Sequence, residues 1–219
     1  KKLNCDLVIV GAGPAGIFTA YELLLREPER NIIIVEKGLP IEKRHCPKSV
    51  TKQCVNCKPH CHITTGFSGA GAFSDGKLSL SPDVGGDLPT LIGEQLAAET
   101  INYTDKIYLQ FGADTHVEGL GNTEEVKEIR KRAIMAGLRL VDCPIRHLGT
   151  EHAHEIYLGI EKYLQEHDVE MLFSHECTNL SIVDGECKGV FVTDGKEETE
   201  ITAKHTVVAT GRRGADWLE

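Results

Sequence analysis

The most constraining feature of the sequence is a glycine-rich turn between a short apolar run and a helical pattern. Residues 5–10 form a Val- and Ile-rich run that is too short for a helix and fits a buried parallel strand. The turn at residues 11–16 follows at once, and residues 14–26 carry apolar side chains at helical spacing. A second buried strand is predicted at residues 32–35. Strand, turn, helix and strand within about 30 residues predict a βαβ unit of a Rossmann-like parallel sheet.

Five of the six residues of this turn have an expected role in forming a dinucleotide site. Gly11 permits a tight turn out of the strand, Gly13 lets the backbone approach a pyrophosphate, and Gly16 allows close packing of helix on strand. Pro14 and Ala15 open the helix, where the missing N–H of proline costs nothing. The helix N-terminus then supplies N–H donors and the positive end of a dipole to an anionic ligand.

Glu36 closes the second predicted strand, about 20 residues after the turn, where an acid accepts hydrogen bonds from ribose hydroxyls. A 2′-phosphate would be repelled by this carboxylate, so NADP is disfavoured at this site and FAD or NAD remain. Lys37, the next residue, is included in the predicted cofactor site.

The chain then leaves the sheet for a long insertion. Residues 39–86 are rich in proline, cysteine and glycine with little periodicity, which is typical of a functional loop, and helical spacing resumes between residues 91 and 134 with Asn122 expected to open the last helix. The predicted organisation is a βαβ unit at 1–38, an inserted loop and helical subdomain at 39–149, and a return to the cofactor-binding fold at 150–219.

Two Asp-Gly pairs predict how the chain returns to the sheet. Asp184-Gly185 and Asp194-Gly195 divide residues 178–203 into three short alternating runs, which is typical of an antiparallel meander. Residues 206–209 are predicted to re-enter the parallel sheet as a separate strand that ends in Thr210-Gly211. The predicted fold class is α/β: a Rossmann-like parallel sheet with an antiparallel β-meander and an inserted loop and helical subdomain.

This arrangement resembles the glutathione-reductase-like flavoprotein superfamily. The likeness rests on the N-terminal glycine turn, the long insertion after the second strand and the return through a meander to Ala209-Thr210-Gly211. The resemblance implies that the dinucleotide is FAD, with Thr210 and Gly211 near its phosphates and ribose.

Motifs in the middle of the chain narrow the resemblance. They are Cys46-Pro47, Cys54-x-x-Cys57-x-Pro59-x-Cys61, the GFSGAGAFSDGK stretch at residues 66–77, and Arg146-His147-Leu148-Gly149-Thr150. Together they resemble the FAD-dependent dehydrogenase family of bacteria and archaea often labelled NAD(FAD)-utilising dehydrogenases. The resemblance implies a cytosolic flavoprotein with an unassigned substrate, normally longer than this chain, so that a C-terminal part with the rest of the FAD site is expected beyond it.

The glycine-rich stretch is expected to border the isoalloxazine ring, because small residues let backbone pass close to a flat ligand; Gly69, Ala70 and Gly71 are its predicted contacts. Lys77 is a candidate catalytic residue that would stabilise the anion formed when the flavin is reduced, with a solvated lysine as the alternative. His147 is a second candidate, as a proton donor or acceptor near neutral pH, with a structural histidine as the alternative.

Four cysteines in one loop form a candidate metal site. The spacing of Cys54 and Cys57 brings two sulfurs onto one ion, and Cys46 and Cys61 would complete four ligands for zinc or an iron–sulfur cluster. A redox-active disulfide that exchanges electrons with the flavin, or unliganded reduced thiols, are the alternatives.

Composition excludes several classes of partner. A net charge of -9 argues against general affinity for nucleic acid or anionic membranes. No run approaches the roughly 18 apolar residues that span a bilayer. Eight cysteines without a visible signal peptide favour a reducing cytoplasm over a disulfide-rich secreted domain.

The predicted function is therefore a FAD-dependent oxidoreductase that transfers hydride or electrons to or from a small-molecule substrate. NAD(P)H stays open as a partner, although no second strand-preceded GxGxxG supports it. The alternative is a non-catalytic redox sensor or electron carrier in which the cysteine loop is the working part and FAD is structural.

Overall fold

A computed structural model describes residues 1–211, 214 and 217, and it divides into two compact units. Unit 1 comprises Lys1–Phe73 and Tyr157–Glu219, and unit 2 comprises Ser74–Ile156. The predicted boundaries at residues 39 and 149 differ from this division. The loop after residue 38 belongs to unit 1, because its backbone bonds to the sheet region: Ser68 N–H donates to the Ala12 carbonyl at 2.7 Å.

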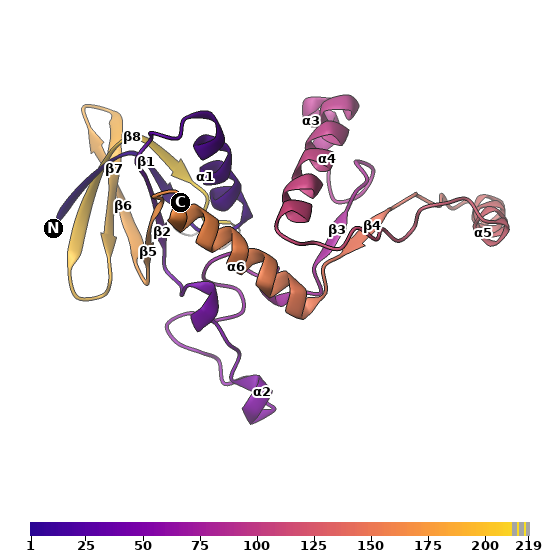
Figure 1. Cartoon of the computed structure of the whole chain (residues 1–219), viewed down its shortest axis with the longest axis horizontal. Helices are drawn as coiled ribbons and strands as arrows, with labels where there is room; N and C mark the ends of the chain where they lie inside the picture. The colour runs from indigo at the N-terminus through magenta and orange to yellow at the C-terminus, as the bar shows by residue number, and fades with distance from the viewer. Residues whose placement is uncertain (212–213, 215–216, 218–219) are drawn as a thin grey trace. The chain divides into compact units, whose positions relative to one another are not determined.

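Unit 1 is built on one six-stranded mixed sheet with the strand order β5-β2-β1-β8-β7-β6 (Figure 1). β2 is parallel to β1 and β5, and β8 is parallel to β1, whereas β7 is antiparallel to both β6 and β8. The strands are β1 (Lys2–Val10), β2 (Ile32–Glu36), β5 (Glu170–Phe173), β6 (Glu176–Val183), β7 (Glu186–Thr193) and β8 (Glu198–Val208).

The last strand corrects one predicted boundary. The third run of the meander and the returning parallel strand are not separate, because β8 continues unbroken from the meander into the parallel sheet. Between Ala203 and Thr206 the sequence is Lys-His, which contains no glycine, proline or Asx turn signal, so the chain stays extended. One strand therefore joins the meander to the parallel sheet.

The core of unit 1 is apolar on both faces of the sheet. Residues 7–10 of β1 and 32–35 of β2 are all at most 5% exposed, as expected for parallel strands covered on both sides. α1 (Pro14–Arg26) buries Ile17 and Leu24, and the part of α6 (Thr150–Glu166) that lies in unit 1 buries Ile160 and Leu164. Unit 1 also contains three short helical turns: η1 (Ile41–Lys43), α2 (Lys48–Thr51) and η2 (Gly71–Phe73).

Unit 2 contains helices and a two-stranded antiparallel sheet. Its elements are α3 (Leu88–Ile92), α4 (Glu94–Gln110), α5 (Glu124–Met135), β3 (Lys77–Ser79) and β4 (Ile145–His147). The N-cap of α5 is Thr123, whose hydroxyl accepts a hydrogen bond from Val126 N–H. The sequence pattern predicts that this helix begins at Asn122, one residue earlier. Along the described ranges, none of the helices combines the length and apolar character needed to cross a bilayer.

Candidate cofactor-binding site

The carboxyl ends of four parallel strands surround one cavity in unit 1. The cavity has a volume of about 640 Å³. It lies where β1 is flanked by β2 on one side and β8 on the other, which is the position at which open α/β sheets bind ligands. Predicted cofactor residues in its lining are Gly11, Gly13, Pro14, Glu36, Lys37, Gly69, Ala70, Thr210 and Gly211.

Gly13 faces the cavity at the start of α1. It is the N-cap of the helix, no side chain caps this end, and the first turn carries no acid. The first N–H groups of a helix have no partner inside it, so they and the positive dipole end are available to an anion. A Cβ built on Gly13 would meet no atom within 4 Å. The packing of the protein does not demand glycine here, so the open space is room for a ligand.

At Gly11 and Gly16, unlike at Gly13, the packing of the protein itself requires glycine. A Cβ on Gly11 would lie 2.5 Å from the Ala209 carbonyl oxygen, and its φ of +107° disfavours any other residue. A Cβ on Gly16 would lie 2.0 Å from the Gly11 carbonyl oxygen. Gly16 therefore packs helix against strand and is absent from the cavity lining, as is the exposed Ala15.

Glu36 is buried at the end of β2 and is already hydrogen-bonded. Its Oε2 accepts from Ala12 N–H at 2.9 Å and its Oε1 accepts from Gly38 N–H at 2.8 Å. The carboxylate thereby fixes both the glycine turn and the exit of β2. A carboxylate has about four acceptor positions, so capacity remains for ribose hydroxyls from the cavity side.

The opposite side of the cavity is formed by residues 64–70, here named the loop wall. Thr64, Thr65, Gly66, Gly69 and Ala70 of this segment line the cavity. Gly71 does not, because it packs in unit 1 against Tyr157: a Cβ there would lie 2.7 Å from the phenol oxygen.

Sequence reasoning missed the residues that follow β5. His175, Glu176 and Cys177 line the cavity because β5 lies beside β2, which places their chain at the same sheet edge. Trp217 also lines it and donates its indole N–H to the Thr178 carbonyl at 3.2 Å. The available signal was the short sequence Val-Glu-Met-Leu-Phe at residues 169–173, which is typical of a strand, since parallel strands share one carboxyl edge.

Comparison with known proteins relates this chain to flavoproteins. Residues 111–219 match the family model described as "FAD binding domain". This match and a flavoprotein relative support FAD as the cofactor of the chain. The chain is 24% identical over 219 residues to the 8-methylmenaquinol:fumarate reductase flavoprotein subunit of Wolinella succinogenes, covering 95% of this chain and 31% of that protein. An uncharacterised protein of Clostridium beijerinckii is also 24% identical over 219 residues, covering 100% of this chain and 33% of that protein. The chain spans about a third of the length of these curated relatives.

Solved structures share the fold of this chain. A 3-ketosteroid-Δ4-(5α)-dehydrogenase from Rhodococcus jostii has a TM-score of 0.58 at 14% identity, over 95% of this chain and 46% of that one. The L-amino acid deaminase from Proteus vulgaris has a TM-score of 0.53 at 18% identity, over 94% of this chain and 47% of that one. At these identities the likeness is one of fold, and it agrees with the predicted α/β class.

The cysteine loop, residues 46–61, gathers the four predicted thiols around one small cavity. Cys46, Cys54, Cys57 and Cys61 line a space of about 50 Å³ together with His62. The eight cysteines of the chain all lie in the described residues, and none of them is in a disulfide bond. Within the described residues no three His, Cys, Asp or Glu side chains are placed to share a metal ion. The structure thus brings the cysteines together without closing a ligand shell, and metal binding stays a prediction.

The two candidate catalytic residues are neighbours in unit 2. Lys77 of β3 pairs directly with His147 of β4. Lys77 Nζ lies 2.8 Å from the Asp75 carboxylate, and this hydrogen bond raises the pKa of the lysine. His147 Nε2 lies 3.3 Å from Glu118. Both side chains are exposed, and Lys77 is ion-paired with Asp75, so the contact of Lys77 with a flavin stays a prediction.

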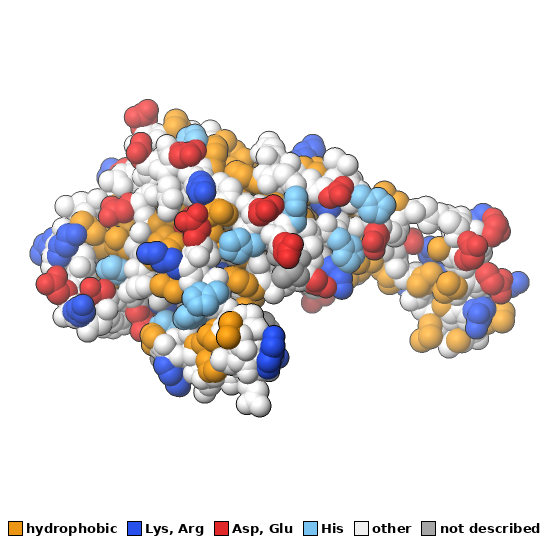
Figure 2. Space-filling view, turned by 60° about the horizontal axis from the view of Figure 1, so that its bottom comes forward, with side chains coloured by type: hydrophobic (Ala, Val, Ile, Leu, Met, Phe, Trp, Pro, Cys, Tyr) orange, Lys and Arg blue, Asp and Glu red, His pale blue; other side chains and the backbone are white. Residues whose placement is uncertain are grey.

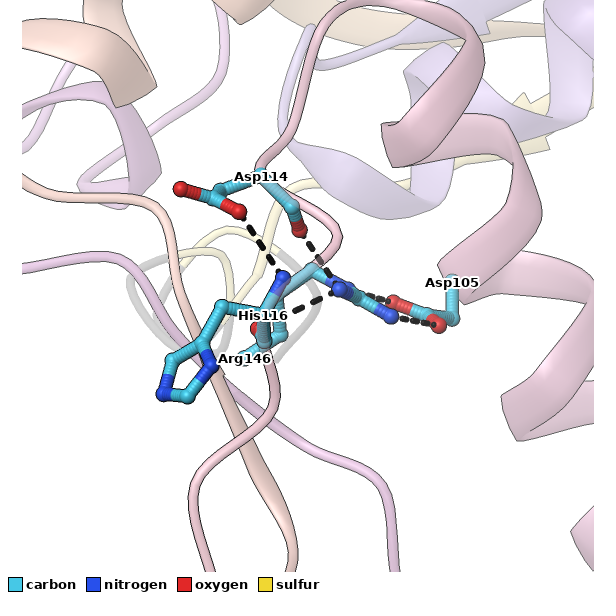
Figure 3. Close-up of polar contacts among 4 residues, drawn as sticks. All are labelled: Asp105, Asp114, His116 and Arg146. Carbon is cyan, nitrogen blue, oxygen red and sulfur yellow. Dashed lines mark hydrogen bonds and ion pairs between the residues drawn. The ribbon is translucent and has the colours of Figure 1, made fainter.

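Arg146, next to His147, has a structural role inside unit 2. Its guanidinium binds both carboxylate oxygens of Asp105 at 2.6 and 2.7 Å. It also donates to the Asp114 and His116 carbonyls at 2.5 and 3.3 Å (Figure 3). Because Arg146 is only 4% exposed, these bonds fix the loop after α4 to β4.

Proposed function

We propose that this chain is the FAD-binding part of a flavin-dependent oxidoreductase that passes hydride or electrons to or from a small-molecule substrate. The observation that carries the proposal is Gly13, which leaves open space in the cavity at an uncapped helix N-terminus. We place the pyrophosphate of FAD there and its ribose beside Glu36. The names of the similar proteins, a reductase and a dehydrogenase, support this reaction class. The motifs of the cysteine and glycine loops favour the NAD(FAD)-utilising dehydrogenases among flavoprotein families.

The residues of the chain have distinct tasks in this proposal. Bound FAD would supply the redox chemistry. The N-terminus of α1 binds the pyrophosphate, and Glu36 accepts from ribose hydroxyls while it holds the turn in place. Lys77 keeps a positive charge available because Asp75 stabilises its protonated form. His147, held by Glu118, serves as the proton donor or acceptor.

Gly13→Val tests the placement of the cofactor. The side chain would occupy the space assigned to the pyrophosphate, so we expect FAD binding to be lost while the free protein stays folded, since nothing of the protein lies within 4 Å. Trp217 is the single tryptophan of the chain and lines the cavity, so quenching of its fluorescence by FAD reports binding. Ala136→Val, which adds bulk at an exposed position after α5, is the control.

Wild-type flavin content in purified Gly13→Val would mean that the cofactor is placed wrongly. Turnover of NAD(P)H with an electron acceptor separates an enzyme from a redox sensor. The sensor alternative instead predicts a thiol- or metal-dependent conformational change without turnover.

A second proposal concerns the cysteine loop, because its four thiols line one cavity. We propose that a reducing cytosolic setting keeps these thiols available to bind zinc or an iron–sulfur cluster once the loop closes around the ion. Protein purified without oxygen should contain zinc or iron, and combined Cys54→Ala and Cys57→Ala should remove the metal but leave FAD. Cys187→Ala, at an exposed cysteine of β7, is the control. Metal-free protein with four titratable thiols in the loop would leave only the thiol alternatives.

A further inference from the structure

A buried arginine lies behind the loop wall of the cofactor cavity. Arg44 follows η1 and is only 3% exposed, with its guanidinium 4.6 Å from the centroid of the Phe73 ring. All five of its N–H groups donate to uncharged acceptors. Nε donates to His62 O (2.9 Å), Nη1 to Phe67 O and to Ser68 Oγ (3.4 Å), and Nη2 to Ile63 O (2.7 Å) and Gly69 O (2.6 Å).

This pattern separates Arg44 from an ordinary buried ion pair. Among the residues that the structure describes, no carboxylate lies within salt-bridge distance of it, whereas buried arginines are normally paired with acids. Burial lowers the pKa of Arg44 to about 10, so the side chain remains charged at neutral pH. Because every donor is used, no N–H remains for a ligand. Arg44 therefore acts on the protein backbone.

The backbone that Arg44 binds is strained. Ser68 is fully buried and has a φ of +69°, which is unfavourable for a residue with a side chain, and Gly66 and Gly69 also have positive φ. A Cβ on Gly66 would lie 2.6 Å from Arg44 Cδ, so the arginine packs directly on this glycine. Such a conformation persists only when its surroundings hold it, and the carbonyl bonds from Arg44 supply that restraint.

The same segment contacts the cofactor turn. Ser68 N–H donates to the Ala12 carbonyl, and residues on both sides of Ser68 line the cavity. We propose that Arg44 is a positioning residue that holds the loop wall in the geometry that FAD binding needs. The inference rests on the proposed placement of FAD in this cavity.

Arg44→Lys tests the inference, because lysine keeps the charge but offers three donors in place of five. We expect the FAD dissociation constant of the full chain, measured by calorimetry, to rise at least about tenfold as carbonyls of the loop wall lose their partners. Amide hydrogen exchange should accelerate in peptides covering residues 62–73 and stay unchanged in β1, β2 and β8. Arg30→Lys, at a partly exposed arginine before β2, should change neither measurement.

Unchanged FAD affinity in Arg44→Lys would overturn the inference. Faster exchange throughout the sheet would also overturn it, since Arg44 would then be a general stabiliser. If Arg44→Lys does not fold, the test uses Phe73→Leu, which removes only the ring beside the guanidinium. This variant should weaken FAD binding about two- to fivefold. Wild-type FAD affinity in Phe73→Leu would overturn the inference. Failure of the proposed function would give a different result, because Gly13→Val would then bind FAD as tightly as the wild type does.

Discussion

The two units of this chain are stabilised by different interactions. In unit 1, residues 7–10 of β1 and 32–35 of β2 are apolar and buried, with Ile9, Ile32 and Ile34 showing no exposed surface. In unit 2 few large apolar side chains are buried, and the most enclosed polar feature is the pair of Arg146 and Asp105, whose side chains are 5% and 12% exposed. Where an apolar sheet supplies most of the stability, the polar groups at its edge can serve a ligand in addition to the fold. Where apolar burial is scarce, the polar groups themselves hold the fold.

α5 shows how little apolar burial unit 2 contains. None of its residues is buried, and Ile129, Ile134 and Met135 are 52%, 67% and 74% exposed. Figure 2 shows these hydrophobic side chains on the surface over α5, beside charged ones. The stability of unit 2 thus depends on a small number of contacts, and loss of one of them should reduce its free energy of unfolding substantially.

The largest effect is expected for Arg146→Met. Removing one partner of a buried ion pair leaves the Asp105 charge uncompensated, which typically costs about 3–5 kcal/mol. Urea unfolding followed by far-UV circular dichroism reports both units, whereas Trp217 fluorescence reports unit 1. We expect the dichroism transition to move to lower urea and the Trp217 transition to move less. Equal shifts of both signals would show that the units unfold together. Arg139→Met, at an exposed arginine, is the control.

A matched pair of isoleucine substitutions tests whether the two units differ in the stability that apolar burial gives them. Ile34→Ala removes a side chain with no exposed surface from β2 and should reduce the free energy of unfolding by about 2–5 kcal/mol. Ile134→Ala, the same change on α5, should alter it by no more than about 0.5 kcal/mol. Denaturant titration of both variants measures the difference. Similar losses would mean that α5 is covered in solution.

A smaller, pH-dependent effect is expected at Glu161, a buried acid in unit 1 that accepts from Ile41 N–H at 2.9 Å. Burial raises the pKa of this carboxyl. As pH rises from the ordinary glutamate pKa through the raised one, the unfolded chain loses this proton first, so the group progressively destabilises the folded state. Glu161→Gln should therefore gain stability relative to wild type as pH rises above the ordinary glutamate pKa of 4.5. A difference that does not vary with pH would contradict this.

The sequence predicts best where structure is set by neighbouring residues. The start and end of α1 agree with prediction because Pro14, the apolar spacing and the preceding glycine turn act within a few residues of each other. The cavity lining after β5 was missed because it depends on which strand lies beside β2, a contact between residues far apart in sequence. Arg44 was missed because a lone arginine in a polar loop resembles a surface charge until its buried carbonyl partners are known.

Gly13 has a consequence for the evolution of this chain. Its φ of −78° and ψ of 179° are accessible to any residue, and its Cβ position is empty. In the free protein alanine would fit without strain and would restrict the unfolded chain, which usually stabilises a protein by about 0.4–1 kcal/mol. Folding alone would thus favour a larger residue. If the pyrophosphate binds here as we propose, residue 13 is a position at which selection for stability and selection for function act in opposite directions.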